Sequence, residues 1–183
     1  MVYRFTIISD EVDNFRREIQ IDSEATFLDF HNAILKSVSY PNDQMTSFFV
    51  CDDNWEKETE ITLEDMGTSS EMDSWIMEET SLSDLLEDEK QHLLYIFDPL
   101  ADRAFFIELS EIITGKNLAE AICTKQMGDA PQHLLDFDQL MATQVATTAL
   151  DDNFGDDEDF DLDELDPDGF EMGSAEDFEN MLY

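Results

Sequence analysis

Histidine and cysteine are the side chains of this sequence best suited to nucleophilic or acid–base chemistry. The sequence holds three histidines, His31, His92 and His133, and two cysteines, Cys51 and Cys123. None of them lies in a Gly-x-Ser-x-Gly, Cys-x-x-Cys or other recognisable nucleophile motif. We therefore assign no catalytic residue, and we predict structural histidines and two reduced, mostly buried thiols, as in a cytoplasmic protein.

Carboxylates crowd the stretch 156–168, so a calcium-binding loop has to be tested there. With Gly169 at the sixth loop position, the twelfth falls on Ala175, where a bidentate Glu is needed, and Pro167 occupies the fourth. No His and Cys residues have zinc-ligand spacing, and the six glycines form no phosphate-binding loop. The sequence predicts no metal site and no cofactor beyond loose collection of divalent cations by the acidic stretch.

Single aromatic residues set between acidic ones are the most distinctive pattern of the C-terminal third. Exposed rings gain nothing in water, so a merely solubilising segment has no need of them. Spaced rings between carboxylates are typical of segments that bind basic, partly apolar surfaces and become ordered on binding. The residues that we predict to contact a partner are Phe137, Phe154, Phe160, Phe170, Phe178, Met181 and Leu182.

Two short helices are predicted within this C-terminal segment. Residues 132–141 can form an amphipathic helix with Leu134, Phe137, Leu140 and Met141 on one side. Residues 175–183 can form another. The alternative interpretation is a solvated tail whose rings fold back on the domain of the same chain.

Charge is very unevenly balanced in the 183 residues. There are 46 Asp and Glu against 9 Lys and Arg, which gives a formal net charge of −37. Lys125 is the last basic residue, and residues 126–183 hold 18 acidic residues and no basic one. This balance argues against direct binding to nucleic acid or to an anionic membrane surface, since both need a basic face. It favours a basic partner, and no signal peptide or membrane-spanning run is visible.

The order of apolar patterns predicts an α+β fold, a mostly antiparallel sheet packed by one main helix. Helical spacing from Phe27 to Val38, with Thr26 as N-cap, predicts that helix. A helical turn is expected through Leu82 and Leu86, and residues 65–80 are expected to be irregular with Trp75 and Ile76 as an anchor. Alternation and apolar runs predict strands at 3–9, 15–21, 47–51, 60–63, 92–97, 104–109 and 121–123.

A turn signal at residues 128–131 marks the expected end of the folded domain. We predict a domain over residues 1–131 and an acidic, largely disordered tail over residues 132–183, because self-repulsion and sparse aliphatic residues cannot offset chain entropy.

Five short runs, in order along the chain, carry a resemblance to a known family. They are Tyr3-Arg-Phe-Thr-Ile, Arg16-Arg-Glu-Ile, the helix from Ala25 to Ile34, Tyr95-Ile-Phe-Asp and Ile107-Glu-Leu. Over about residues 1–131 the chain resembles the plasmid pRiA4b ORF-3-like family, whose members are also labelled insertion-element passenger (TnpR-type) proteins. The resemblance implies an α+β fold and no established reaction.

One stretch departs from the family pattern. The usual Gly-Asp-x-Trp-x-His run is replaced here by Pro99-Leu-Ala-Asp-Arg-Ala-Phe105. Any chemistry that the run carries in relatives is therefore lost in this chain.

Taken together, these features predict a non-enzymatic cytoplasmic interaction protein. Its acidic tail would dock on a basic macromolecular partner such as a nucleic-acid-binding protein, a polymerase or a ribosome. One alternative is a DNA-transaction accessory of a mobile element, which would require Arg4, Arg16, Arg17 and Arg103 to cluster. Another is an enzyme with an unrecognised carboxylate site, which would show raised carboxyl pKa values in a pocket.

Overall fold

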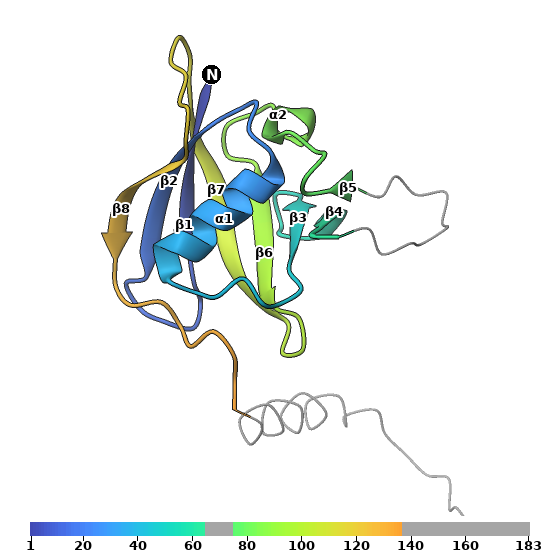
Figure 1. Cartoon of the computed structure of the whole chain (residues 1–183), viewed down its shortest axis with the longest axis vertical. Coiled ribbons are helices and arrows are strands. Elements are labelled where there is room, and N and C mark those ends of the chain that lie inside the picture. Colours follow the sequence, from blue (N-terminus) through green and yellow to red (C-terminus); the bar gives the residue numbers. More distant parts are fainter. Residues whose placement is uncertain (65–74, 137–183) are drawn as a thin grey trace, which may run out of the picture. The chain divides into compact units, whose positions relative to one another are not determined.

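The computed structural model describes residues 1–64 and 75–136 and confirms the predicted α+β class. Eight strands form one sheet in the order β5-β4-β3-β6-β7-β1-β2-β8, and the described residues also contain two helices (Figure 1). Among the strands that the structure describes, only the pairing of β4 with β5 is parallel. The elements are β1 Val2–Ile8, β2 Arg16–Asp22, α1 Phe27–Val38, β3 Ser47–Cys51, β4 Lys57–Thr62, β5 Trp75–Ile76, α2 Leu82–Leu85, β6 His92–Asp98, β7 Arg103–Ile113 and β8 Ile122–Met127.

The chain divides into two compact units, Met1–Thr143 and Gln144–Tyr183, and every described residue belongs to the first. Neither helix in residues 1–64 and 75–136 has the length and apolar character needed to cross a membrane.

Helix α1 begins and ends where the sequence predicts. The Thr26 hydroxyl accepts a hydrogen bond from the Asp29 amide (3.2 Å), and the Asp29 carboxylate accepts one from the Thr26 amide (3.1 Å), which completes a capping box. Ser39 ends the helix in the left-handed conformation, with φ at 59°. The residues predicted for the apolar face are all buried, namely Phe27, Phe30, Ile34, Leu35 and Val38.

Aromatic rings fill the layer between α1 and the sheet. Phe30 stacks on Phe5 and Phe48 at centroid distances of 4.3 and 5.4 Å, and Tyr95 lies 4.8 Å from Phe48. Each of these four side chains is fully buried. Burial of a ring of this size contributes roughly 2–3 kcal/mol, so this layer is the main source of stability for the fold.

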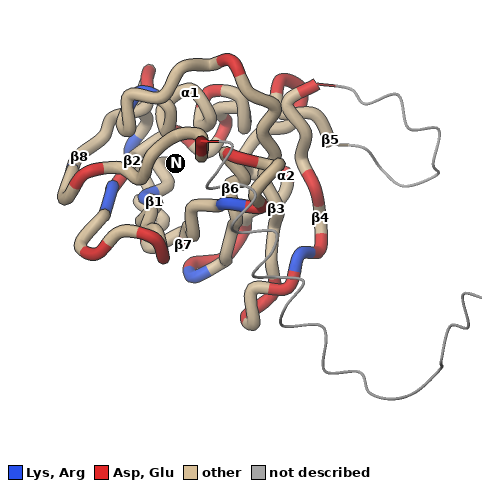
Figure 2. The backbone as a smooth tube through the Cα atoms, turned by 90° about the horizontal axis from the view of Figure 1, so that it is seen from below, with Lys and Arg blue, Asp and Glu red and all other residues tan. Residues whose placement is uncertain are grey.

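The sheet has one covered face and one open face. Figure 2 shows the strands curving beneath α1, which lies on one side only. Helix α2 packs beside the start of α1, where the Leu82 amide donates to the Ala25 carbonyl (2.9 Å). No helix in the described part of the chain lies over the opposite side, which we call the open face.

Four strands differ from the sequence prediction. β8 runs to Met127 rather than residue 123, because its residues are mostly exposed and polar and give no alternation signal. β7 is longer than residues 104–109, and β4 begins at Lys57, three residues before the predicted start at Glu60. β5 is a two-residue strand where only an irregular anchor was predicted, since so short a run carries no pattern.

Gly128 redirects the chain after β8. Its φ is 65°, and a Cβ at this position would lie 2.8 Å from the carbonyl oxygen of Asn14. A side chain is therefore excluded unless the backbone shifts. The turn leads to Pro131, which is buried, and the described residues continue to Asp136. The domain boundary at residue 131 stays a prediction.

Candidate functional site

A row of apolar side chains crosses four strands on the open face. Residues of a strand alternate between faces, so residues paired in register share a face. Phe49 of β3 pairs with Leu94 of β6, Leu94 pairs with Phe106 of β7, and Phe106 pairs with Ile8 of β1. Ile8 is 46% exposed. Solvated faces of antiparallel sheets are normally polar, whereas Phe49 and Phe106 in this row are partly buried and Leu94 between them is only 7% exposed.

A groove of about 500 Å³ lies along part of this row. Its apolar lining comes from β6 and β7 and consists of Leu94, Ile96, Ala104 and Phe106. Leu135, in the segment after β8, also lines it. The charged lining residues are Asp10, Glu11, Lys57, Asp102 and Arg103. An apolar floor with a few charged groups at its rim suits the side chain of a peptide.

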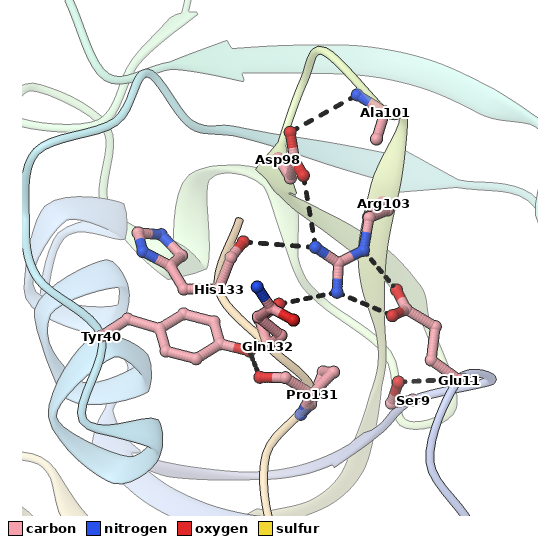
Figure 3. A network of polar contacts seen from close by, with 9 residues as sticks. All are labelled: Ser9, Glu11, Tyr40, Asp98, Ala101, Arg103, Pro131, Gln132 and His133. Atoms are coloured by element: carbon pink, nitrogen blue, oxygen red, sulfur yellow. Dashed lines mark hydrogen bonds and ion pairs between the residues drawn. The ribbon is translucent and has the colours of Figure 1, made fainter. Parts of the chain in front are cut away.

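Arg103 anchors the C-terminal segment at one end of this groove (Figure 3). Its guanidinium donates to both Glu11 oxygens, at 2.9 Å from Nε and 2.7 Å from Nη2, and to Asp98 at 3.2 Å. It also donates to the backbone carbonyls of Gln132 (2.7 Å) and His133 (3.3 Å). A planar guanidinium can hold several acceptors in a fixed geometry, so this side chain fixes both the carboxylates and the chain path.

Burial alone would lower the pKa of Arg103, but the hydrogen bonds and charges of Glu11 and Asp98 outweigh it and raise the pKa. The side chain is only 9% exposed, and Asp98 is 3% exposed. Two acidic partners and two carbonyls stabilise this buried cation. The cluster therefore forms an ion-pair anchor.

Tyr40 holds Pro131, the residue that precedes Gln132 and His133. Its hydroxyl donates to the Pro131 carbonyl at 2.5 Å, and its ring stacks on His133 at 4.4 Å. Burial is the main cause that raises the pKa of Tyr40, so the hydroxyl stays protonated and remains a donor. Three consecutive residues, 131–133, are thus attached to the domain, and His133, predicted to begin the tail, is part of this attachment.

A second aromatic group lies farther along the open face. Trp55 stacks on His92 at 4.1 Å and meets Phe106 edge-on at 5.1 Å. Trp55 has a φ of 67°, which is an uncommon conformation for a bulky residue. The Asp52 carboxylate stabilises this turn by accepting from the Asn54 and Glu56 amides at 2.8 and 2.9 Å. The turn places the indole beside the apolar row.

His31 belongs to α1 and is fully buried between the helix and the covered face of the sheet. Its Nδ1 is 2.8 Å from the Tyr95 hydroxyl and 3.3 Å from the Thr46 hydroxyl, and its Nε2 is 3.3 Å from Asn42 Oδ1. A neutral ring that donates from Nε2 and accepts at Nδ1 satisfies these contacts. Burial lowers the pKa of His31, which favours this neutral form. The geometry assigns His31 a structural role in the core.

The two thiols lie apart from any activating group among the described residues. Cys51 is buried, and burial is the main cause that raises the pKa of its thiol. A raised pKa disfavours the reactive thiolate. Cys123 lies in β8 and donates to the Lys125 carbonyl.

Within residues 1–64 and 75–136 no group of three or more His, Cys, Asp or Glu is placed to hold a metal ion. The acidic stretch 156–168 lies outside these residues. So do all the residues predicted to contact a partner, namely Phe137, Phe154, Phe160, Phe170, Phe178, Met181 and Leu182. Their role stays a prediction.

The four arginines do not form a basic face. Arg4 pairs with Glu111, and Arg16 pairs with Glu18 at 2.8 Å. Arg17 is buried and donates to the carbonyls of Ser37 and Met127 at 3.1 and 2.6 Å. Figure 2 shows acidic residues spread over the described backbone, with few basic ones between them.

Comparison with known proteins gives the chain a family. The match to that family covers residues 2–171, which is most of the sequence. The chain belongs to the plasmid pRiA4b ORF-3-like family. The match runs well past residue 131, where the resemblance seen in the sequence ended. No curated protein matches the chain.

One solved structure with the same fold is a protein of unknown function from Methanosarcina mazei Go1. It is 20% identical, with a TM-score of 0.53, and the alignment covers 84% of this chain and 83% of the other. Similarity at this level shows a shared fold.

The stretch from Pro99 to Phe105, which departs from the family pattern, comprises the β6–β7 turn and the first three residues of β7, beginning with Arg103. The sequence analysis predicted only a loss at this stretch and missed the anchor at Arg103. In the structure Asp98 pairs with Arg103 across the turn, and no motif in the sequence indicates that pairing. The apolar row was signalled by the run from Leu93 to Phe97, which is buried on both faces.

Proposed function

We propose that this member of the family is a non-enzymatic cytoplasmic interaction protein. Its acidic C-terminal segment binds a basic macromolecular partner, namely a nucleic-acid-binding protein, a polymerase or a ribosome. The observation that carries the proposal is the attachment of residues 131–133 by Arg103 and Tyr40. This attachment fixes the point at which the C-terminal segment, which has acidic but no Lys or Arg residues, leaves the domain.

The charge of the chain supports the same conclusion. Carboxylates of the segment would steer a basic partner into contact, and the rings between them would supply buried area. The alternative role in DNA transactions would need a cluster of free arginines. The four candidates are instead paired with carboxylates or buried, namely Arg4, Arg16, Arg17 and Arg103. The alternative of an enzyme with a carboxylate site would show raised carboxyl pKa values. Among the described carboxyl groups, the two with a shifted pKa are Asp22 and Asp52, and both pKa values are lowered.

The test is a binding assay with three purified probes: ribosomes, RNA polymerase and a histone-like DNA-binding protein. The full chain should bind at least one probe at low salt and lose it as salt is raised, because exposed charges are screened. A variant ending at Thr143 should not bind.

Two matched variants separate the contributions of charge and rings. In one, Phe154, Phe160, Phe170 and Phe178 become Ser, which keeps every charge. In the other, acidic residues of 151–168 become Asn or Gln, which keeps every ring. Each should weaken binding. Equal binding with and without residues 144–183, or at low and high salt, would refute the proposal.

A further inference from the structure

Strand β8 lies at the border of the sheet that the structure describes, and only one of its two backbone edges is paired there. Its partner is β2 (Figure 1). The large apolar residues at its two ends, Ile122 and Met127, are 48% and 44% exposed. An edge strand presents amide and carbonyl groups to any strand that can align with it. A further strand can therefore join the sheet at β8.

The charge of β8 differs from that of the chain as a whole. The chain has 46 acidic residues, but residues 122–127 contain none and hold one basic residue, Lys125. The Lys125 ammonium lies 3.9 Å from the Glu18 carboxylate of β2, so its charge is directed along the open face and not across the free edge. A net charge of −37 keeps two copies apart over most of their surfaces. Along β8, two copies can approach without opposing carboxylates.

A bulge changes the order in which the side chains of β8 alternate between the two faces. Cys123 pairs with Ile19 of β2 and Lys125 pairs with Glu18, which leaves Thr124 as an extra residue between them. Ile19 and Glu18 are neighbours in β2 and point to opposite faces, so Cys123 and Lys125 also lie on opposite faces. In a regular strand, residues two apart share a face. The bulge therefore reverses the alternation halfway along β8.

This reversal allows β8 to pair antiparallel with β8 of a second copy. Ile122 and Met127 both lie on the open face, because they pair with Gln20 and Arg16 of β2. In a regular strand, two residues with this odd separation would lie on opposite faces. A two-fold axis at the centre of residues 122–127 then places Ile122 of each copy opposite Met127 of the other. The two exposed apolar side chains cover each other at both ends of the pair.

Other two-fold registers oppose residues of different faces. An axis through Thr124 would set Cys123 against Lys125, and an axis through Lys125 would set Cys123 against Met127. Each of these pairs joins a covered-face residue to an open-face residue, which strand pairing does not allow. Bulges and lysines commonly protect edge strands from chance pairing. Here the bulge leaves one register, and in that register Lys125 lies opposite Thr124 and not opposite the second lysine.

We infer that this chain forms a two-fold symmetric dimer in which residues 122–127 of two copies pair and the two sheets become continuous. Just beyond the pair, Glu120 of one copy would lie opposite Asp129 of the other, so repulsion ends the pairing there. Paired strands of six residues bury little area, which gives a weak dimer that forms at high protein concentration. This dimer does not depend on the proposed function, because no residue of the C-terminal segment contributes to it.

The experiment is sedimentation equilibrium of the full chain, without any partner, over a range of protein concentrations. We expect a monomer–dimer equilibrium in about 0.1 and about 1 M salt, where the Debye lengths are about 10 and about 3 Å. The dissociation constant should fall as salt is raised, because screening weakens the repulsion between two acidic chains. Binding of a basic partner to the C-terminal segment should change with salt in the opposite direction, so the two proposals can fail separately.

Two matched double variants test whether β8 forms the contact. Ile122→Glu with Met127→Glu places carboxylates opposite each other at both ends of the pair and should weaken the dimer at least about tenfold. The control, Met45→Glu with Leu100→Glu, adds the same charge at residues outside β8 that are 45% and 75% exposed. In about 1 M salt, where exposed charges are screened, the control should leave the dissociation constant unchanged. Equal weakening in both variants would overturn the inference.

A mixture of two single variants tests the register and does not rely on a loss. Mixed in equal amounts, Ile122→Lys and Met127→Glu place opposite charges across one end of the dimer, so the mixture should associate more tightly than either variant alone. Misfolding cannot produce such a gain. A mixed dimer no tighter than the two homodimers would overturn the inferred register. A chain that stays monomeric at every concentration, even in about 1 M salt, would overturn the dimer itself.

Discussion

The covered and open faces of the sheet differ in what their apolar side chains contact. On the covered face, Phe5 and Phe48 stack on Phe30 of α1 and are fully buried. On the open face, Phe49 and Phe106 are half-buried and contact Lys57 and Trp55. The same strands therefore contribute fully buried rings to the core on one side and carry partly buried rings on the other. The difference shows that apolar content alone does not identify the core.

The largest expected effect tests the covered face. Phe48→Ala should lower the free energy of unfolding by about 3–5 kcal/mol, because it leaves a cavity among fully buried rings. Urea unfolding followed by circular dichroism measures this. A loss below about 1 kcal/mol would show that the two faces do not differ as described.

Arg103→Leu tests the junction between the two faces. It should cost about 3 kcal/mol, because Asp98 would remain buried without its cationic partner. Glu11→Gln should cost much less, since Glu11 is more exposed than Asp98. Urea unfolding of both variants is compared with wild type, and equal losses would argue against an anchor centred on Asp98. Arg103→Leu should also increase hydrogen exchange at residues 132–135.

His31 on the covered face should make the free energy of unfolding depend on pH, with an effect of intermediate size. Burial holds its pKa in the folded chain below the unfolded value of about 6.5. Its contribution to stability is thus fully present above about pH 6.5 and is lost as the pH falls toward the folded pKa. Unfolding free energies measured between about pH 7.5 and pH 5.5 should decrease. His31→Gln should flatten this slope, and His133→Gln should keep it; an unchanged slope in His31→Gln would contradict the assignment.

The smallest expected effect belongs to the open face. Phe106→Thr should change the free energy of unfolding by less than about 1 kcal/mol, because threonine suits a strand and the ring is only partly buried. It should still perturb Trp55 fluorescence, since the two rings lie 5.1 Å apart. A loss as large as that of Phe48→Ala would place Phe106 in the core.

Much of the fold could be predicted from local patterns. The capping box at Thr26, the buried face of α1 and the central strands all follow from spacing along the chain. The groove could not be predicted, because it depends on the register that aligns Phe49, Leu94 and Phe106 across three strands. The Arg103 anchor depends on a segment about thirty residues later returning to the β6–β7 turn, which no local pattern encodes.

The attachment of residues 131–133 has a consequence for which substitutions this chain can accept. Tyr40 and Arg103 bind three backbone carbonyls, and these are present whatever side chains the residues carry. The side chain of residue 132 can thus change while the chain keeps its path, whereas the His133 ring also stacks on Tyr40. The path of the chain in this protein depends instead on the side chains that hold these carbonyls, Tyr40 and Arg103, and on the carboxylates that hold Arg103, Glu11 and Asp98. A change at Tyr40 or Arg103 would therefore alter the path of the chain after β8 more than a change at residue 132 would.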